Sequence, residues 1–276
     1  MKIIDGKALA NQLRERLKEK IAVLEKKPGL AVVIVGENPA SQIYVRNKIK
    51  ACGEVGICSY SYELPATATQ AQLNELLDEL GNSENVHGIL LQLPLPDGLC
   101  AEEAAKHIPV EKDVDGFSSE NLGQLMQGKQ TVAACTPAGV MEILRAEGVC
   151  LKGKHAVVLG RSETVGKPMA MLLLNADATV SICHSKTQNL AEICRQADIL
   201  ISAVGVAKFV KADMVKDGAI VVDVGINRDE NGKLCGDVDF ETVAQKCSMI
   251  TPVPGGVGPM TITMLMYNTY LTFVKE

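Results

Sequence analysis

Apolar positions along the chain change from helical to strand-like spacing and back several times. Aliphatic side chains recur every three or four positions between residues 9 and 24 among charged residues, which predicts an amphipathic first helix. The continuous β-branched run 30–35 predicts a buried strand. Segments 57–64 and 86–93 predict two more strands, with a helix capped by Thr69 between them. This alternation is typical of βαβ units and a mostly parallel sheet.

The pattern loosens between residues 97 and 136 and then starts again. A helix is predicted from Thr136-Pro137, and a strand at 155–159 leads through a glycine loop into another helix. The remaining predicted elements are strands at 178–183, 199–204 and 219–224, with a helix at 190–196 between the first two. The restart predicts a second α/β domain. The apolar segment after Met260 is about 15 residues long, shorter than the roughly 20 of a membrane span, and predicts a buried last helix.

Length and composition narrow the classes of partner. A chain of 276 residues with 47% hydrophobic and 22% charged residues suits two globular domains. The net charge of −5, without a basic block, argues against nucleic acid and anionic membranes as partners. Nine scattered cysteines with no C-x-x-C pair predict buried thiols in a reducing cytosol and no metal site. Charges resume directly after Met1, so no signal peptide is expected and the predicted location is cytoplasmic.

Candidate chemistry begins in the stretch 38–50. Asn38-Pro39 is typical of a helix N-cap followed by proline at the first helical position. Tyr44 and Lys48 then lie one turn apart on the same face. An aromatic ring beside an amine could hold a planar substrate against a proton-transfer group. Alternatively, both side chains lie on a solvated helix face.

The second half contains a candidate dinucleotide loop from Gly160 to Gly166. A strand, a glycine turn and a helix present backbone N–H groups and a positive helix end to a pyrophosphate. The loop lacks the usual G-x-G-x-x-G, because Ser162 occupies the position of the second glycine. An ordinary βα turn is the alternative. A nucleophile elbow is excluded, since Thr164 stands where G-x-S-x-G requires glycine.

The end of the following strand favours NADP over NAD. An NAD site usually places Asp or Glu there for the ribose 2′-hydroxyl, whereas this strand ends Cys183-His184-Ser185-Lys186. Arg161, Ser185 and Lys186 could instead hold a 2′-phosphate. His184 is interpreted as a surface residue. Asp223, at another strand end, is interpreted mainly as an acceptor for nearby backbone donors.

Several segments together resemble one family over essentially the full length. They are Tyr44-Val45-Arg46-Asn47-Lys48, Leu90 to Pro96, Lys112-Asp113-Val114-Asp115-Gly116, Cys135-Thr136-Pro137, Gly160 to Pro168, Val222 to Asn227, and Pro252 to Thr261. In this order they resemble the bifunctional methylenetetrahydrofolate dehydrogenase/methenyltetrahydrofolate cyclohydrolase family. The sequence departs from the family pattern at three positions, none of which is expected to be catalytic. Ala134 replaces the usual proline, Ser118 a common histidine and Thr164 a common aliphatic residue.

This resemblance implies roles for individual residues. Lys48 would be the central catalytic group, Gln92 would contact it, Tyr44 would pack on the folate, and Asp115 would bind the pterin. The NADP site would comprise Gly160, Arg161, Ser162, Ser185 and Ile226, together with Thr136. The C-terminal segment would reach the folate through Pro254, Gly255, Gly256 and Val257.

The resemblance also implies a two-domain α/β architecture. Residues 1–136 and 255–276 would form the folate-binding catalytic domain, and 137–254 a Rossmann-like NADP-binding domain with a parallel sheet. The C-terminal helix would return to the first domain, and the substrates would lie in a cleft between the two. A homodimer is expected.

The chemistry of the implied reactions fits these residues. Oxidation of 5,10-methylenetetrahydrofolate by NADP needs mainly positioning, whereas hydrolysis of the methenyl product to 10-formyltetrahydrofolate needs a proton carrier. Burial and an adjacent cationic substrate would disfavour the ammonium form of Lys48, so its amine could act as base and then as acid. Gln92 could orient that amine without adding charge, or simply satisfy a strand end. The alternatives are a shikimate-type NADP dehydrogenase, which would need a Lys–Asp pair, and a non-catalytic dinucleotide-binding protein.

Overall fold

The chain forms two compact units, each assembled from separated segments. The computed structural model describes residues 1–129 and 132–275. Unit 1 comprises Met1–Asn11 and Thr136–Thr261, and unit 2 comprises Gln12–Cys135 and the chain from Ile262 onward. The last helix therefore belongs mostly with the N-terminal half of the chain, as expected. The predicted domain limits, and the cleft expected between the domains, remain predictions.

Unit 2 is built on a parallel sheet in the order β3–β2–β4 within the described residues. The central strand β2 (Gly29–Val35) pairs with β3 (Cys58–Leu64) and β4 (Gly88–Leu91). Every residue of β2 is buried, because helices cover both faces of the sheet. Successive side chains of a strand point to opposite faces, so burial on both sides requires the continuous apolar run of this strand.

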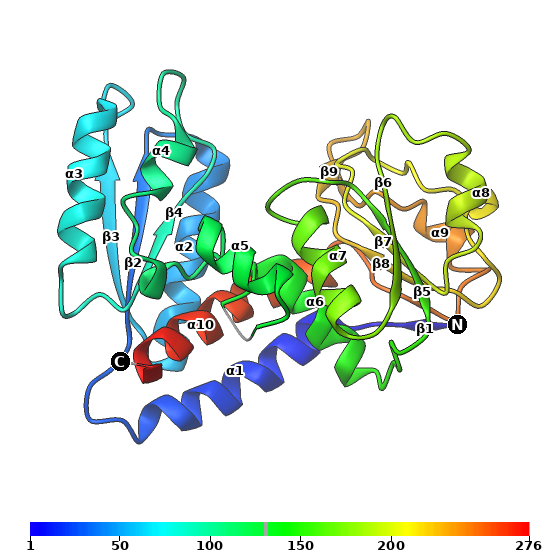
Figure 1. Cartoon of the computed structure of the whole chain (residues 1–276), viewed down its shortest axis with the longest axis horizontal. Coiled ribbons are helices and arrows are strands. Elements are labelled where there is room, and N and C mark those ends of the chain that lie inside the picture. Colours follow the sequence, from blue (N-terminus) through cyan, green and yellow to red (C-terminus); the bar gives the residue numbers. More distant parts are fainter. Residues whose placement is uncertain (130–131, 276) are drawn as a thin grey trace. The chain divides into compact units, whose positions relative to one another are not determined.

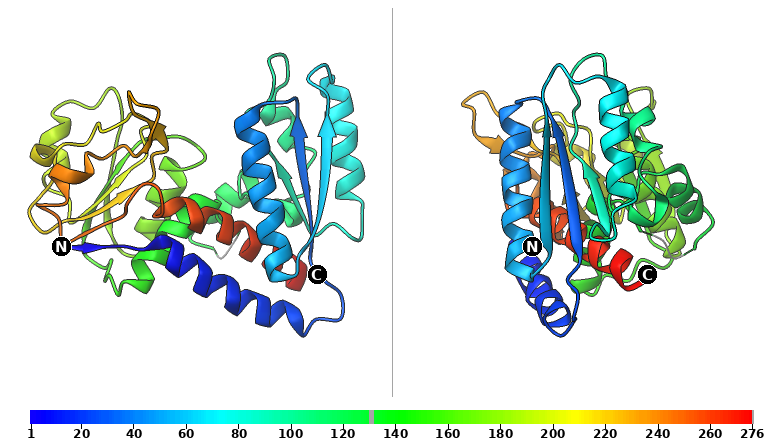
Figure 2. Two further views of the ribbon diagram at one scale, coloured as in Figure 1. Left: turned by 180° about the vertical axis from the view of Figure 1, so that it is seen from behind. Right: turned by 90° about the vertical axis from the view of Figure 1, so that its left-hand side faces the viewer.

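Two separate clusters of apolar side chains cover these faces. One face packs against α1 (Gly6–Ala22), α2 (Pro39–Val55) and α10 (Val257–Lys275). The other packs against α3 (Gln70–Gly81) and α4 (Ala101–Ala105). The sheet is seen between α2 and α3 in Figure 2. A capping box between Thr69 and Gln72 begins α3, as predicted.

The segment between β4 and unit 1 contains more structure than its weak pattern predicts. It includes η1 (Val110–Lys112) and α5 (Ser119–Met126) besides α4. Each of these helices is short, and α5 buries only Asn121 and Leu125. With so few buried positions, a helical period is not visible in the sequence.

Unit 1 contains an all-parallel sheet in the order β1–β11–β8–β7–β5–β6 within the described residues. The strands are β1 (Lys2–Ile3), β5 (His155–Leu159), β6 (Thr179–Cys183), β7 (Ile199–Ser202), β8 (Ile220–Asp223) and β11 (Met249–Ile250). The four longer strands match the predicted ones. The two-residue strands β1 and β11 were not predicted, because they are too short to carry a periodic pattern.

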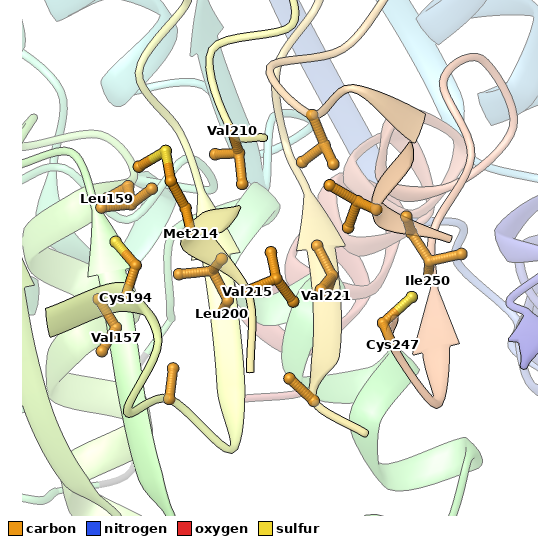
Figure 3. Close-up of a cluster of buried hydrophobic side chains, with 14 of the residues drawn as sticks. Val157, Leu159, Cys194, Leu200, Val210, Met214, Val215, Val221, Cys247 and Ile250 are labelled. Carbon is orange, nitrogen blue, oxygen red and sulfur yellow. The ribbon is translucent and has the colours of Figure 1, made fainter. Parts of the chain in front are cut away.

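One face of this sheet carries the buried cluster drawn in Figure 3, which includes Leu159, Leu200 and Val221. Cys194 and Met214 close it from the short helices α8 (Leu190–Cys194) and η2 (Ala212–Met214). The other helices of this unit are α6 (Cys135–Ala146), α7 (Gly166–Asn175) and α9 (Phe240–Val243), and a small hairpin is formed by β9 (Asn227–Arg228) and β10 (Leu234–Cys235). Across the part of the chain that the structure describes, no helix is long and apolar enough to cross a membrane.

Candidate active site

Helix α2 (Figure 1) presents the first two candidate residues. Its start is fixed by Asn38, whose Oδ1 accepts from the backbone N–H of Ser41 at 3.1 Å. Val45, between the two candidates, is buried and anchors the helix to the core. Tyr44 is 42% exposed, while Lys48, one turn later, is half-buried. The helix therefore presents a ring with a free face next to an amine that is partly withdrawn from solvent.

Gln92 contacts that amine directly. Lys48 Nζ donates to Gln92 Oε1 at 2.9 Å, and Gln92 Nε2 donates to the carbonyl of Leu93 at 2.6 Å. The backbone N–H of Gln92 donates to Val33 O at 2.8 Å, which continues the β2–β4 ladder one residue beyond β4. Gln92 thus contacts the lysine, as the family resemblance implies, and its amide also bonds to the backbone at the strand end. The partner of Lys48 is a neutral amide, which adds no charge.

Asp115 completes this group in unit 2. It is half-buried, and burial raises the pKa of its carboxyl to about 6. The positive charge of Lys48 opposes this rise, and the negative charge of Asp113 reinforces it. The neighbouring thiol of Cys135 lowers the pKa of this carboxyl, against the effect of burial. The structure therefore brings Lys48, Gln92 and Asp115 together, although they come from three separate stretches of the chain.

Cys135 is a neighbour of the site to which the sequence assigned no role. Its side chain is buried, and burial raises the pKa of the thiol well above its ordinary value. The thiol therefore stays protonated and donates, with its Sγ 3.4 Å from Val114 O. The available signal was the Cys135-Thr136-Pro137 motif, which marks the position without indicating what the thiol does.

The dinucleotide loop of unit 1 requires glycine at both ends. Gly160 has φ +118°, and a Cβ there would collide with the carbonyl oxygen of Ala203. A Cβ on Gly166, the first residue of α7, would collide with the carbonyl of Gly160. Ser162 Oγ accepts from the backbone N–H groups of Val165 and Gly166, each at 3.2 Å. The serine in place of the second glycine therefore organises the start of α7 with its own hydroxyl.

The neighbouring strand ends supply polar groups suited to a phosphate. β5 and β6 are paired in parallel, so Arg161 and Ser185 follow adjacent strand ends, and both are exposed, as is Lys186. His184 Nδ1 accepts from the N–H of Lys186 at 3.2 Å, so the histidine closes a local turn. A glycine cradle, a helix N-terminus and a cation, with no carboxylate at the end of β6, fit NADP. Within the described residues, no group of three or more His, Cys, Asp or Glu side chains could hold a metal ion.

Two buried carboxylates shape the loops after β7 and β8. Asp223 Oδ1 and Oδ2 accept from the backbone of Gly225, Asp237 and Val238 at 2.9–3.0 Å, which confirms its interpretation as an acceptor for backbone donors. Burial raises its pKa to about 6, against the effect of these donors. Asp237, which has no exposed area, accepts from five groups: the backbone N–H of Val204, Gly205 and Val206, Asn227 Nδ2 and Ser202 Oγ. Asp237 was missed, because its partners are set by the tertiary fold.

The remaining predicted residues also lie in unit 1. Ile226, in the loop after β8, is 53% exposed. Thr136 Oγ1 lies 2.9 Å from Thr261 Oγ1. The predicted segment from Pro254 to Val257 precedes and begins α10. Gly255 has φ +105° and its carbonyl accepts from the N–H of Lys7 at 3.0 Å, while a Cβ on Gly256 would lie 2.6 Å from Pro252 O. The segment thus needs glycine for its own turn, and it belongs to a different unit from Lys48.

Comparisons with known proteins match the chain to two family models, one for each of two consecutive segments. Residues 4–115 match the model of the tetrahydrofolate dehydrogenase/cyclohydrolase catalytic domain, and residues 134–276 match that of the corresponding NAD(P)-binding domain. The bifunctional protein FolD of Streptococcus thermophilus is 55% identical over 278 residues, which cover 99% of this chain and 98% of that protein.

Solved structures give the same result. The bifunctional enzyme FolD of Campylobacter jejuni superposes with a TM-score of 0.98 at 52% identity, covering 100% of this chain and 99% of that one. The Trypanosoma brucei enzyme, solved with NADP and an inhibitor, gives a TM-score of 0.95 at 41% identity, covering 99% and 97% of the two chains. Since the similarity extends over both units at this identity, the chain belongs to the tetrahydrofolate dehydrogenase/cyclohydrolase family.

Proposed function

We propose that this chain oxidises 5,10-methylenetetrahydrofolate to 5,10-methenyltetrahydrofolate with NADP and hydrolyses that product to 10-formyltetrahydrofolate, with Lys48 as the proton carrier. The observation that carries the proposal is the 2.9 Å bond from Lys48 Nζ to the neutral amide of Gln92 beside Asp115. A shikimate-type enzyme would instead need a lysine paired with an aspartate, and membership of the folate family removes that alternative.

Binding of the folate is assigned to Asp115 and Tyr44. The amide–amidine edge of a pterin offers two adjacent N–H donors, and one carboxylate can accept both. The exposed ring of Tyr44 offers a flat face for the folate. Pro254, Gly255, Gly256 and Val257 have no charged side chain, so they contribute backbone contacts and close approach.

The oxidation step depends on positioning. NADP, when bound, supplies the hydride acceptor. Arg161 and Ser185 hold its 2′-phosphate, and Gly160 and Ser162 shape the loop for its pyrophosphate. Thr136 and Ile226 line the rest of the site. Because the cation formed from the folate is stabilised by its own nitrogens, the chain needs no acid or base for this step.

Hydrolysis is the step that requires Lys48. Water attacks the carbon between the two folate nitrogens and loses a proton, which leaves a hydroxyl group on that carbon. One ring nitrogen then gains a proton as its bond to the carbon breaks, and the hydroxyl proton is released to solvent as the formyl C=O forms. A single amine can accept the first proton and return it in the second step. Gln92 Oε1 accepts a hydrogen bond from the amine and holds it in place.

We also propose that the protein is cytoplasmic and homodimeric. Its nine cysteines, all within the described residues, are free thiols, which suits a reducing compartment. The prediction that they are buried was wrong for Cys58, Cys100 and Cys150, which are exposed. The homodimer rests on the family resemblance and is checked by sedimentation velocity at micromolar concentration.

One assay tests the activity. Purified protein is mixed with 5,10-methylenetetrahydrofolate and NADP, and the absorbance of the methenyl product and its decay to the formyl product are followed. An NADP-dependent rise followed by an enzyme-dependent decay is expected. A protein with no NADP-dependent signal would be a non-catalytic dinucleotide binder, and an equal or higher rate with NAD would overturn the cofactor assignment.

The pH dependence of kcat/KM for the folate should follow the ionisation of Asp115. Its carboxylate must be ionised to accept from the pterin, and its pKa is raised to about 6 by burial. Below that pH the protonated form predominates, so kcat/KM for the folate is expected to fall by about tenfold per pH unit, with little change above it. The profile is measured with the dehydrogenase at saturating NADP. Asp115→Asn should lower kcat/KM and abolish this limb, and a limb that survives in the variant would assign it to another group.

A further inference from the structure

Asn268 is a buried polar residue in the largely apolar helix α10. Its side chain is 3% exposed, and its Nδ2 donates to Val114 O at 2.9 Å and to Ala133 O at 3.0 Å. Both protons of the amide nitrogen are therefore used, each on a main-chain carbonyl outside the helix. Neither bond contributes to the backbone ladder of α10.

The two carbonyls belong to the segments that carry Asp115 and Cys135. Val114 O is part of the peptide group that joins Val114 to Asp115, and Ala133 precedes Cys135 by two residues. Asn268 Nδ2 also lies 3.5 Å from Sγ of Cys135, a residue that neighbours the Asp115 carboxyl. One amide therefore contacts both segments that determine where the Asp115 carboxylate lies.

The same turn is held on its other side by Asp113. This buried carboxylate accepts from the N–H of Gly116 at 2.9 Å and of Ser118 at 2.8 Å, and from Asn121 Nδ2 at 2.9 Å. The two segments are in close contact, since a Cβ on Gly116 would lie 2.8 Å from Ala133 C. Asp113 fixes the turn that follows Asp115. Asn268 fixes the Val114–Asp115 peptide, which precedes it.

We propose that Asn268 is a positioning residue for Asp115, through which the C-terminal helix sets the affinity of the folate site. The amide holds the Val114–Asp115 peptide against the Ala133–Cys135 segment, so that the carboxylate faces the pterin edge. This inference rests on the proposed function, because Asp115 must be the pterin acceptor. It assigns no contact with folate or NADP to Asn268 itself.

The test compares Asn268→Ala with Thr269→Val. Thr269 has no exposed area and its Oγ1 bonds to Leu265 O at 2.8 Å within α10, so its replacement is a buried, polar-to-apolar change on the same helix that leaves the Asp115 turn untouched. For Asn268→Ala, KM for the folate is expected to rise by about tenfold in both reactions, as for a displaced hydrogen-bonding group. KM for NADP is expected to rise less than KM for the folate in Asn268→Ala, since only Thr136 of the assigned cofactor residues adjoins the segment that Asn268 contacts, and to stay within about twofold in Thr269→Val.

The outcomes separate a positioning role from a merely structural one. An unchanged KM for the folate in folded Asn268→Ala overturns the proposal, as does an equal rise in both KM values or the same rise in Thr269→Val. If Asn268→Ala does not fold, Asn268→Ser, which keeps one donor, carries the same test with a smaller expected rise. Wild-type protein without activity would overturn the proposed function, whereas an active wild type with an unaffected variant overturns only this inference.

Discussion

Replacing Lys48 with methionine is expected to slow hydrolysis of methenyltetrahydrofolate by about 10²–10⁴-fold, the usual contribution of a positioned acid–base group. Methionine keeps most of the aliphatic length of lysine and removes the amine that bonds to Gln92 Oε1 at 2.9 Å. The dehydrogenase rate should fall much less, because no proton passes through Lys48 when hydride leaves the folate. The two rates are measured separately, one from purified methenyl substrate and one from NADPH formation.

Lys50→Met provides the matched control for this experiment. Lys50 lies on the same helix two residues later, is exposed, and loses the same charge on replacement. Both reactions should proceed at close to the wild-type rate in that variant, since exposed charge changes of this kind have small effects. Hydrolysis retained by Lys48→Met would exclude Lys48 as the proton carrier and leave it a role in binding.

The elements that carry Tyr44 and Lys48 could be predicted because their signals are local. Asn38-Pro39 predicts the start of α2, and the expected N-cap hydrogen bond from Ser41 N–H to Asn38 Oδ1 is formed. The buried strand β2 likewise follows from an uninterrupted apolar run. An element can be predicted from the sequence when neighbouring residues determine both where it begins and its hydrophobic period, because tertiary contacts then change little.

The start of the last helix shows how the same local logic can mislead. The sequence predicted a last helix in the apolar segment after Met260, whereas α10 begins at Val257. Proline is compatible with the first turn of a helix, where its missing N–H has no partner to lose. Gly258 and Pro259 therefore fit inside the first turn, although together they resemble a loop.

The connections around the site lie beyond local patterns. Nothing near Asn268 in the sequence indicates that its amide reaches Val114 and Ala133, more than 130 residues earlier. The proximity of Gln92 to Lys48 was expected only from the family resemblance, and the thiol of Cys135 was not given a role at all. These contacts depend on how α10, β4 and the segment after η1 pack together. The sequence therefore indicates which side chains could take part in the chemistry, but not which residues hold those side chains in position.

Replacing Asp237 with asparagine is expected to destabilise unit 1 by about 2–4 kcal/mol, because buried N–H groups would lose their acceptor. Oδ2 of Asp237 accepts from Ser202 Oγ, Val204 N and Gly205 N, and Oδ1 from Val206 N and Asn227 Nδ2. An asparagine has one oxygen, so whichever way its amide turns, its NH₂ group faces at least two donors. Calorimetry should show a fall of roughly 5–15 °C in the melting temperature of this unit.

Asp239→Asn makes the same chemical change two residues away and serves as the control. Asp239 pairs with Lys211 at 3.1 Å, and the lysine is half exposed, so its replacement should cost less than about 1 kcal/mol. Since Asp237 joins the loop after β7 to Asn227 beyond β8, Asp237→Asn should also raise KM for NADP while leaving KM for the folate near its wild-type value. A variant as stable as wild type would mean that the amide finds new partners, and the loops after β7 and β8 would then not depend on the charge of this carboxylate.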